Sequence, residues 1–139
     1  PKEGVYDIKS CFTRNSTLIQ YSATQYAYSY EETGTVVSTP PGGLFDGGVV
    51  RCVGMTAVVD GKRSGGSFCE GVDKGGDKRL TQFRFDGDGK LVREAIAGTG
   101  KYDGLELSGS TVKAIGPAAA LKTGATEACN QQTGKYKLK

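Results

Sequence analysis

The 139-residue chain is long enough to bury one hydrophobic core and too short for two, so we expect a single domain over residues 1–139. Its 18 basic and 15 acidic residues are interleaved and give a formal charge of only +3, which excludes the strong electrostatic attraction typical of nucleic-acid binding. No apolar run approaches the roughly 20 residues that a membrane-spanning helix needs. We therefore expect no nucleic-acid partner and no membrane span.

The N-terminal segment is predicted to form a strand. Within residues 5–12 the apolar Tyr6, Ile8 and Phe12 alternate with more polar neighbours, which places Cys11 on the opposite, outer face. The 22 glycines of the chain lie between such apolar runs without a short repeat, a composition that excludes a collagen-like chain and favours an all-β fold. The chain begins at Pro1 with neither an initiator methionine nor a signal-peptide pattern, which fits a processed exported protein or a trimmed chain.

The next strand-like segment, residues 18–30, is rich in tyrosine. Tyr26, Tyr28 and Tyr30 share one strand face, where they line a ligand cavity, cover a subunit contact, or simply pack. Residues 39–48 contain two consecutive prolines, which cannot donate to a strand ladder, so this segment is predicted to be a loop. Its apolar tip, Leu44 and Phe45, suits a flap that covers a mouth.

Residues 49–72 predict a β-hairpin, because an apolar β-branched run leads into Asp60-Gly61, a pair that tight type I′ turns favour. With these two residues as the loop, Cys52 lies opposite Cys69 at a non-hydrogen-bonded position. The Cα atoms approach to about 4.5 Å there, which a disulfide can bridge. The remaining pair would then be Cys11 with Cys129, and four paired cysteines favour an oxidising compartment, either periplasmic or secreted.

Turns at Gly75-Gly76 and within residues 86–89 extend the hairpin to four strands. Two-residue turns bring one largely apolar face together, formed by Val49, Arg51, Val53, Met55, Phe68, Glu70, Val72, Thr81, Phe83, Phe85, Val92, Glu94 and Ile96. The other face, with both cysteines, is expected outside. A slip of one residue inverts such an assignment, and a three-residue loop at the last turn would bring Arg93 inward in place of Glu94.

The rest of the chain supplies the remaining strands. Glycines at 98, 100, 104 and 109 suit a tightly curved strand, and residues 134–138 a closing one. About eight strands joined mainly by short turns predict an eight-stranded antiparallel β-barrel, whose interior is filled or holds one small ligand. A two-sheet β-sandwich is the alternative.

The order of motifs resembles the allene oxide cyclase and dirigent-like barrel superfamily, a calycin-like architecture, and in particular its small exported bacterial members. The matching features are Arg51-Cys52, Cys69, residues 73–78, the Gly-Thr-Gly-x-Tyr-x-Gly segment at 98–104, and residues 108–111. The resemblance covers roughly residues 49–112 and implies an eight-stranded barrel with a mouth at one end, often oligomeric. In the plant enzymes of this group the barrel folds a reactive hydrophobic substrate. Because the shared motifs are structural turns, it carries over no catalytic residue.

The absence of histidine excludes Ser-His-Asp and Cys-His catalysis and all histidine-containing metal sites. No cysteines have Cys-x-x-Cys spacing, so we expect neither a metal nor a cofactor. The predicted register instead aligns Arg51, Glu70, Thr81 and Glu94 on the apolar face. If buried there, Glu70 or Glu94 would have a raised pKa and serve as a general acid or base, and the alternative is a structural ion pair between Arg51 and Glu70.

Three functions follow from these patterns. The first is an exported carrier that binds a small, largely apolar ligand inside the barrel, with Arg51 as anchor and wall residues Val53, Met55, Phe68, Thr81, Phe83, Phe85 and Tyr28. The second is a cyclase or isomerase that uses Glu70 or Glu94. The third is a non-enzymatic interaction module with a filled barrel, whose outer tyrosines form a homo-oligomer or partner contact.

Overall fold

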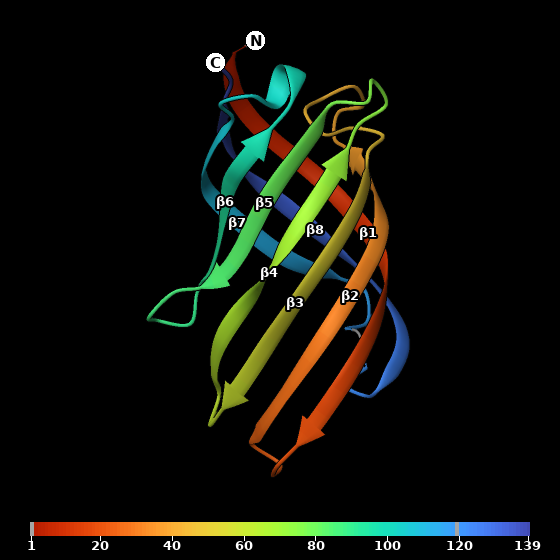
Figure 1. Cartoon of the computed structure of the whole chain (residues 1–139), viewed down its shortest axis with the longest axis vertical. Coiled ribbons are helices and arrows are strands. Elements are labelled where there is room, and N and C mark those ends of the chain that lie inside the picture. The colour runs from red at the N-terminus through yellow and green to blue at the C-terminus, as the bar shows by residue number, and fades with distance from the viewer. Residues whose placement is uncertain (1, 119) are drawn as a thin grey trace.

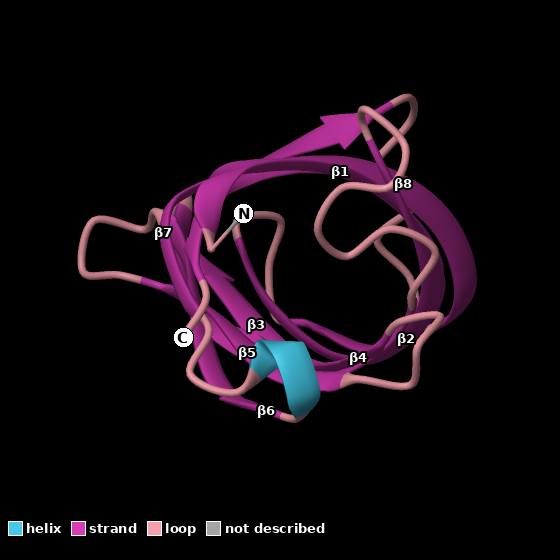
Figure 2. Cartoon of the chain, turned by 90° about the horizontal axis from the view of Figure 1, so that it is seen from above, coloured by secondary structure: helices cyan, strands magenta, loops and turns pink. Residues whose placement is uncertain are grey.

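A computed structural model describes residues 2–118 and 120–139 of the chain. Eight antiparallel strands form one sheet that curls into a nearly closed barrel (Figures 1 and 2), which confirms the predicted architecture over the alternative sandwich. The strands are β1 (Glu3–Gln20), β2 (Gln25–Ser38), β3 (Val49–Val59), β4 (Lys62–Val72), β5 (Lys78–Phe85), β6 (Leu91–Gly98), β7 (Glu106–Ile115) and β8 (Gly124–Lys137). One short 3-10 helix, η1 (Gly100–Tyr102), follows β6.

The barrel closes through pairing of the N- and C-terminal strands. The strand order is β6-β5-β4-β3-β2-β1-β8-β7, so β1 pairs with both β2 and β8. Strands β6 and β7 are the two edges of this sheet and lie next to each other without a ladder between them. Loop 39–48 and η1 lie at one end of the barrel, at the top of Figure 1, together with both termini. The β1–β2 and β3–β4 turns lie at the other end.

The β3–β4 hairpin has the predicted register. Val59 pairs with Lys62 across the Asp60-Gly61 turn, and Cys52 pairs with Cys69. The two sulfur atoms are bonded, with 4.1 Å between the Cα atoms, and Cys11 is bonded to Cys129. Both predicted disulfides are therefore confirmed.

The next two turns are each one residue longer than predicted. The amide of Asp73 donates to Asp77 O and that of Asp86 donates to Lys90 O, so each loop holds three residues. The last residue of each loop, Gly76 or Gly89, has a φ of 86° or 77°, a left-handed conformation that only glycine adopts without strain. The extra residue in each loop shifts β5 relative to β4, and β6 relative to β5, by one position from the predicted registers.

The inner face of β3 and β4 is therefore the opposite of the predicted one. Val53, Met55 and Phe68 are 49%, 69% and 47% exposed on the outer surface, and the Cys52–Cys69 disulfide is buried inside. On β5 the prediction was right, because Thr81, Phe83 and Phe85 line the interior. On β6 the three-residue loop brings Arg93 inward in place of Glu94, as that alternative anticipated.

Small side chains face inward on β3 and β4 because large ones from neighbouring strands cross over them. A Cβ atom on Gly54 would lie 2.7 Å from the Tyr30 ring, and one on Gly71 would clash with the Arg79 guanidinium. The inner surface of these two strands therefore provides room for side chains of β2 and β5. The inner face predicted from apolar character alone was wrong, because side-chain volume and not hydrophobicity decides the packing here.

The hydrophobic core occupies the loop 39–48 end of the barrel. Its buried members are Tyr6, Ile8, Val36, Phe45, Tyr102 and Leu105. Phe45 is only 1% exposed and stacks on Tyr102 with ring centroids 5.6 Å apart. The Asp46 carboxylate fixes the loop by accepting hydrogen bonds of 2.8 Å from the amides of Ser38 and Gly42. We call this the closed end, and the predicted flap over a mouth is thus a plug that fills one end.

Candidate binding site inside the barrel

A cavity of about 270 Å³ lies inside the barrel and is lined by side chains from all eight strands. A second cavity of about 380 Å³ adjoins it at the other end, beside residues 117, 118 and 120–122, and shares Phe12, Arg14, Tyr28 and Arg63 as lining residues. We call this second end the mouth. Because binding pockets for drug-sized molecules usually measure about 300–1,000 Å³, the inner cavity suits a ligand at or below the small end of that range.

Four of the seven predicted wall residues line this cavity. Thr81, Phe83, Phe85 and Tyr28 do so. The predicted wall residues Val53, Met55 and Phe68 are on the outer surface, and the predicted anchor Arg51 is exposed beside Glu70 in the ladder.

The two candidate catalytic carboxylates also lie outside. Glu70 is exposed, and Glu94 forms a 2.6 Å ion pair with Arg84 on the outer face of β5 and β6. The expected row of Arg51, Glu70, Thr81 and Glu94 is split between the two faces, because the longer turns change the register. No general acid or base is provided inside the barrel by these two residues.

The floor of the cavity is formed by two arginines that the predicted site did not include. Arg79 of β5 and Arg93 of β6 are 2% and 6% exposed, and both line the cavity. Their guanidinium carbons lie 4.3 Å and 5.1 Å from the centroid of the Phe45 ring. Arg93 is also 5.4 Å from the Tyr6 ring and 5.3 Å from that of Phe83.

These cations are poorly compensated. Among residues 2–118 and 120–139, no carboxylate lies within 4.0 Å of either guanidinium, and Nη1 of Arg79 and Nε and Nη1 of Arg93 are buried without a hydrogen-bond partner. Burial lowers the pKa of Arg79 to about 10, and it also lowers the pKa of Arg93. Both remain charged at neutral pH.

Asp73 is the acidic group that lies near Arg79, but it is engaged elsewhere. Its Oδ2 accepts a 3.1 Å hydrogen bond from the Tyr102 hydroxyl and pairs with Lys101 Nζ at 2.5 Å. Burial alone would raise the Asp73 pKa, but hydrogen bonds from Lys101 and Tyr102 outweigh it, so this pKa is lowered. Asp73 therefore ties η1 to the β4–β5 loop, and its charge offsets the burial of Arg79 only in part.

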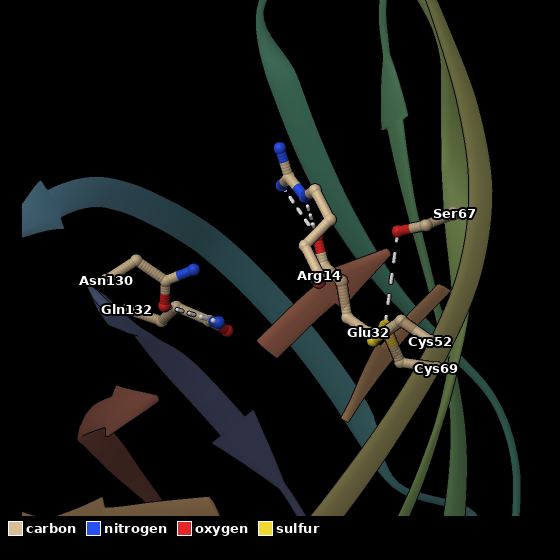
Figure 3. Close-up of a disulfide and its surroundings, with 7 residues drawn as sticks. All are labelled: Arg14, Glu32, Cys52, Ser67, Cys69, Asn130 and Gln132. Carbon is tan, nitrogen blue, oxygen red and sulfur yellow. Dashed lines mark hydrogen bonds and ion pairs between the residues drawn. A yellow bond between two sulfur atoms is a disulfide. The ribbon is translucent and has the colours of Figure 1, made fainter. Parts of the chain in front are cut away.

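Toward the mouth the cavity has a paired arginine. Arg14 donates to Glu32 at 2.8 Å (Figure 3). Its guanidinium lies over the Tyr30 ring, 4.9 Å from the centroid. Tyr28 and Tyr30 also line the cavity, and burial raises the pKa of the Tyr30 hydroxyl. The tyrosine stripe therefore faces the interior, and the hypothesis that it forms an outer contact is wrong.

The inner disulfide forms part of the cavity wall. Figure 3 shows the Cys52–Cys69 disulfide beside the Ser67 hydroxyl. The hydroxyl oxygen lies 4.0 Å from Cys69 Sγ, and Asn130 and Gln132 of β8 line the same cavity. Cys11, in contrast, is only half-buried, and it joins β1 to β8. Two disulfides indicate that the protein folds in an oxidising compartment.

Among the described residues, neither a metal-binding group nor a membrane-spanning helix is found. Within 2–118 and 120–139, no three His, Cys, Asp or Glu side chains gather into a group that could hold a metal ion. In the same ranges no helix has both the length and the apolar character to cross a membrane.

No protein-family model, no curated protein and no solved structure matches this chain, so its function is inferred from its own geometry.

One feature of the sequence, the small residues on one face of β3 and β4, indicates that large side chains such as Arg79 fill the interior. Gly54, Ser67 and Gly71 are small residues on the same face as the two cysteines, as the β3–β4 register shows. A face so poor in side-chain volume has to be filled from the neighbouring strands. That signal points to large inward side chains on β2 and β5, and Tyr30 and Arg79 supply them.

Proposed function

We propose that this protein is an exported, periplasmic or secreted, carrier that binds a small, largely apolar molecule inside its barrel. The observation that carries this proposal is the inner cavity, which is walled mainly by apolar and aromatic side chains and continues to the mouth. The closed end is plugged by Phe45, so a ligand enters at the mouth, past residues 120–122. The oxidising compartment fits export, and the barrel fits the resemblance to allene oxide cyclase-like proteins.

A cyclase or isomerase is favoured less. Its candidate residues Glu70 and Glu94 are on the outer surface, and the Glu32 carboxylate inside is already paired with Arg14. The interaction module remains an alternative through other residues, since Val53 and Phe68 are neighbours on the exposed outer face of β3 and β4. A homo-oligomer contact there would leave the interior free.

Titration of the protein with methyl heptanoate, a neutral apolar probe, tests the carrier function by calorimetry. Ser67 faces the cavity, and Ser64 on the same strand is exposed. Ser67→Leu should fill the cavity and weaken binding at least tenfold, whereas the matched control Ser64→Leu should bind like the wild type. Thermal unfolding establishes that both variants are folded. Absence of probe binding to the wild type, or equal binding by both variants, would contradict an interior site.

A further inference from the structure

The cavity is strongly polar at the closed end and apolar between that end and the mouth. Arg79 and Arg93 lie at the closed end, and the side chains directly beyond them are neutral: Ile8, Val50, Phe83, Phe85 and Leu91. At the opposite end the lining cations are Arg14, which is paired with Glu32, and Arg63, which is exposed to solvent. A ligand with one charged end and an apolar body would match this arrangement in a single orientation.

Contact with aromatic rings leaves N–H groups of both arginines without a hydrogen-bond acceptor among the described residues. A guanidinium that lies over a ring uses its flat face, while its N–H groups point outward in the plane of the group. Phe45 is shared by both arginines, and its ring carries no net charge and accepts no in-plane hydrogen bond. The three unpartnered nitrogens of Arg79 and Arg93 are therefore donors directed at nothing that the described residues supply.

Two buried cations without a carboxylate are unfavourable, since each loses its hydration without a compensating charge. The nearby groups relieve this only in part: Asp73 and Tyr102 favour the charged form of Arg79, but burial outweighs them. Asp73 is itself held by Lys101 and Tyr102, and Glu32 by Arg14. Oxyanions match guanidinium edges in geometry as well as in charge, and a planar carboxylate matches them bidentately.

We propose that the closed end of the cavity is an oxyanion subsite, in which Arg79 and Arg93 hold the head group of a small amphipathic ligand whose apolar body extends toward the mouth. This inference rests on the proposed carrier function and specifies its ligand class. The shared chemistry is an oxyanion on a short apolar chain, and a carboxylate, a sulfate ester and a phosphate ester are its sources.

The test compares charged and neutral ligands of equal length. Heptanoate, heptyl sulfate, heptyl phosphate, methyl heptanoate and inorganic sulfate are titrated into the wild type and into Arg79→Met and Arg93→Met variants. The control is Arg84→Met, because Arg84 is an arginine of the same strand as Arg79 but faces outward and pairs with Glu94. In the wild type and the control we expect at least one anion to bind tenfold or more tightly than the ester. In both floor variants that ratio should fall toward one while the ester still binds.

The outcomes separate this inference from the carrier function. If the ester binds the wild type as tightly as every anion, the subsite is wrong and the carrier stands. If inorganic sulfate alone binds and no heptyl compound does, the subsite stands and the apolar ligand does not. If nothing binds, both are wrong.

Unfolding temperatures distinguish a binding role of the two arginines from a purely structural one. We expect Arg79→Met and Arg93→Met to unfold at the wild-type temperature or above, because each removes an uncompensated buried charge. A lower unfolding temperature together with an unchanged anion-to-ester ratio would assign both arginines to packing and overturn the subsite. Arg93→Lys, which keeps the charge but loses the planar edge, should retain a reduced preference for anions.

Discussion

Both ends of the cavity contain arginine that lies over aromatic rings, but in the part of the chain that the structure describes the arginine has a carboxylate partner only at the mouth. At the mouth, Arg14 lies over Tyr30 and is paired with Glu32 at 2.6 Å. At the closed end, Arg79 and Arg93 lie over Phe45, and no carboxylate of the described residues is within 4.0 Å of either. Arg14 thus has its charge partner within the protein, whereas the proposed partner of Arg79 and Arg93 is a bound anion. This difference supports the proposed oxyanion subsite at the plugged end.

The largest expected effect comes from removing the plug. Phe45→Ala deletes a fully buried ring that stacks on Tyr102 and lies under both floor arginines, so it should lower the free energy of unfolding by about 4 kcal/mol. Urea denaturation measures this, with Leu44→Ala, at a half-buried neighbour, as the control that should lose much less. Equal losses in both variants would mean that the two ends do not differ in packing as described.

Because Arg14 has a carboxylate partner and Arg93 has none among the described residues, replacing each with methionine should change the free energy of unfolding in opposite directions. Arg14→Met leaves the largely buried Glu32 without its partner and should destabilise the protein by about 2 kcal/mol. Arg93→Met removes a buried cation that has no carboxylate partner and should stabilise the protein by about 2 kcal/mol. Urea unfolding of both variants in a sulfate-free buffer measures the difference. Destabilisation by Arg93→Met would show that the aromatic rings alone compensate this charge.

A smaller effect with a defined pH dependence is expected for Asp73 at the closed end. Its pKa is lowered from 3.8 in the folded state, so the stability it contributes is present above about pH 4 and is lost as the pH falls through the folded pKa. Asp73→Asn should therefore reduce the free energy of unfolding by about 1 kcal/mol at pH 7. The gap to the wild type should narrow in denaturation curves at pH 3. A gap independent of pH would assign the effect to lost packing.

The smallest effect is expected on the outer surface, which neither end of the cavity reaches. Met55→Gln changes a side chain that is 69% exposed, so it should alter the free energy of unfolding by no more than about 0.5 kcal/mol and leave heptanoate binding unchanged. Unfolding and calorimetric titration measure the two quantities. A loss of binding in this variant would place β3 with its odd-numbered residues inward, as the apolar pattern alone predicts.

Much of the fold was predictable from the sequence, but only part of the site was. The Asp60-Gly61 turn defined the register of β3 and β4, and the cysteines agreed with it. The turns at 74–76 and 87–89 were not distinguishable from two-residue turns by composition, since several glycines offered alternative positions for the left-handed residue. Each added residue changed a register, and that separated Glu94 from the interior and brought Arg93 in.

Local chemistry in the chain thus determined the β-strands, the β3–β4 hairpin pairing and the Cys52–Cys69 pair, because turns and alternation act between neighbours in sequence. Cys11 and Cys129 followed as the remaining pair. Only the tertiary structure decided which side of those strands faces inward. That choice depends on volume shared across strands, where Gly54 and Gly71 make room for Tyr30 and Arg79. It also depends on Phe45, which a distant loop inserts beneath the two arginines. Such packing joins residues far apart in the chain, so no local pattern contains it.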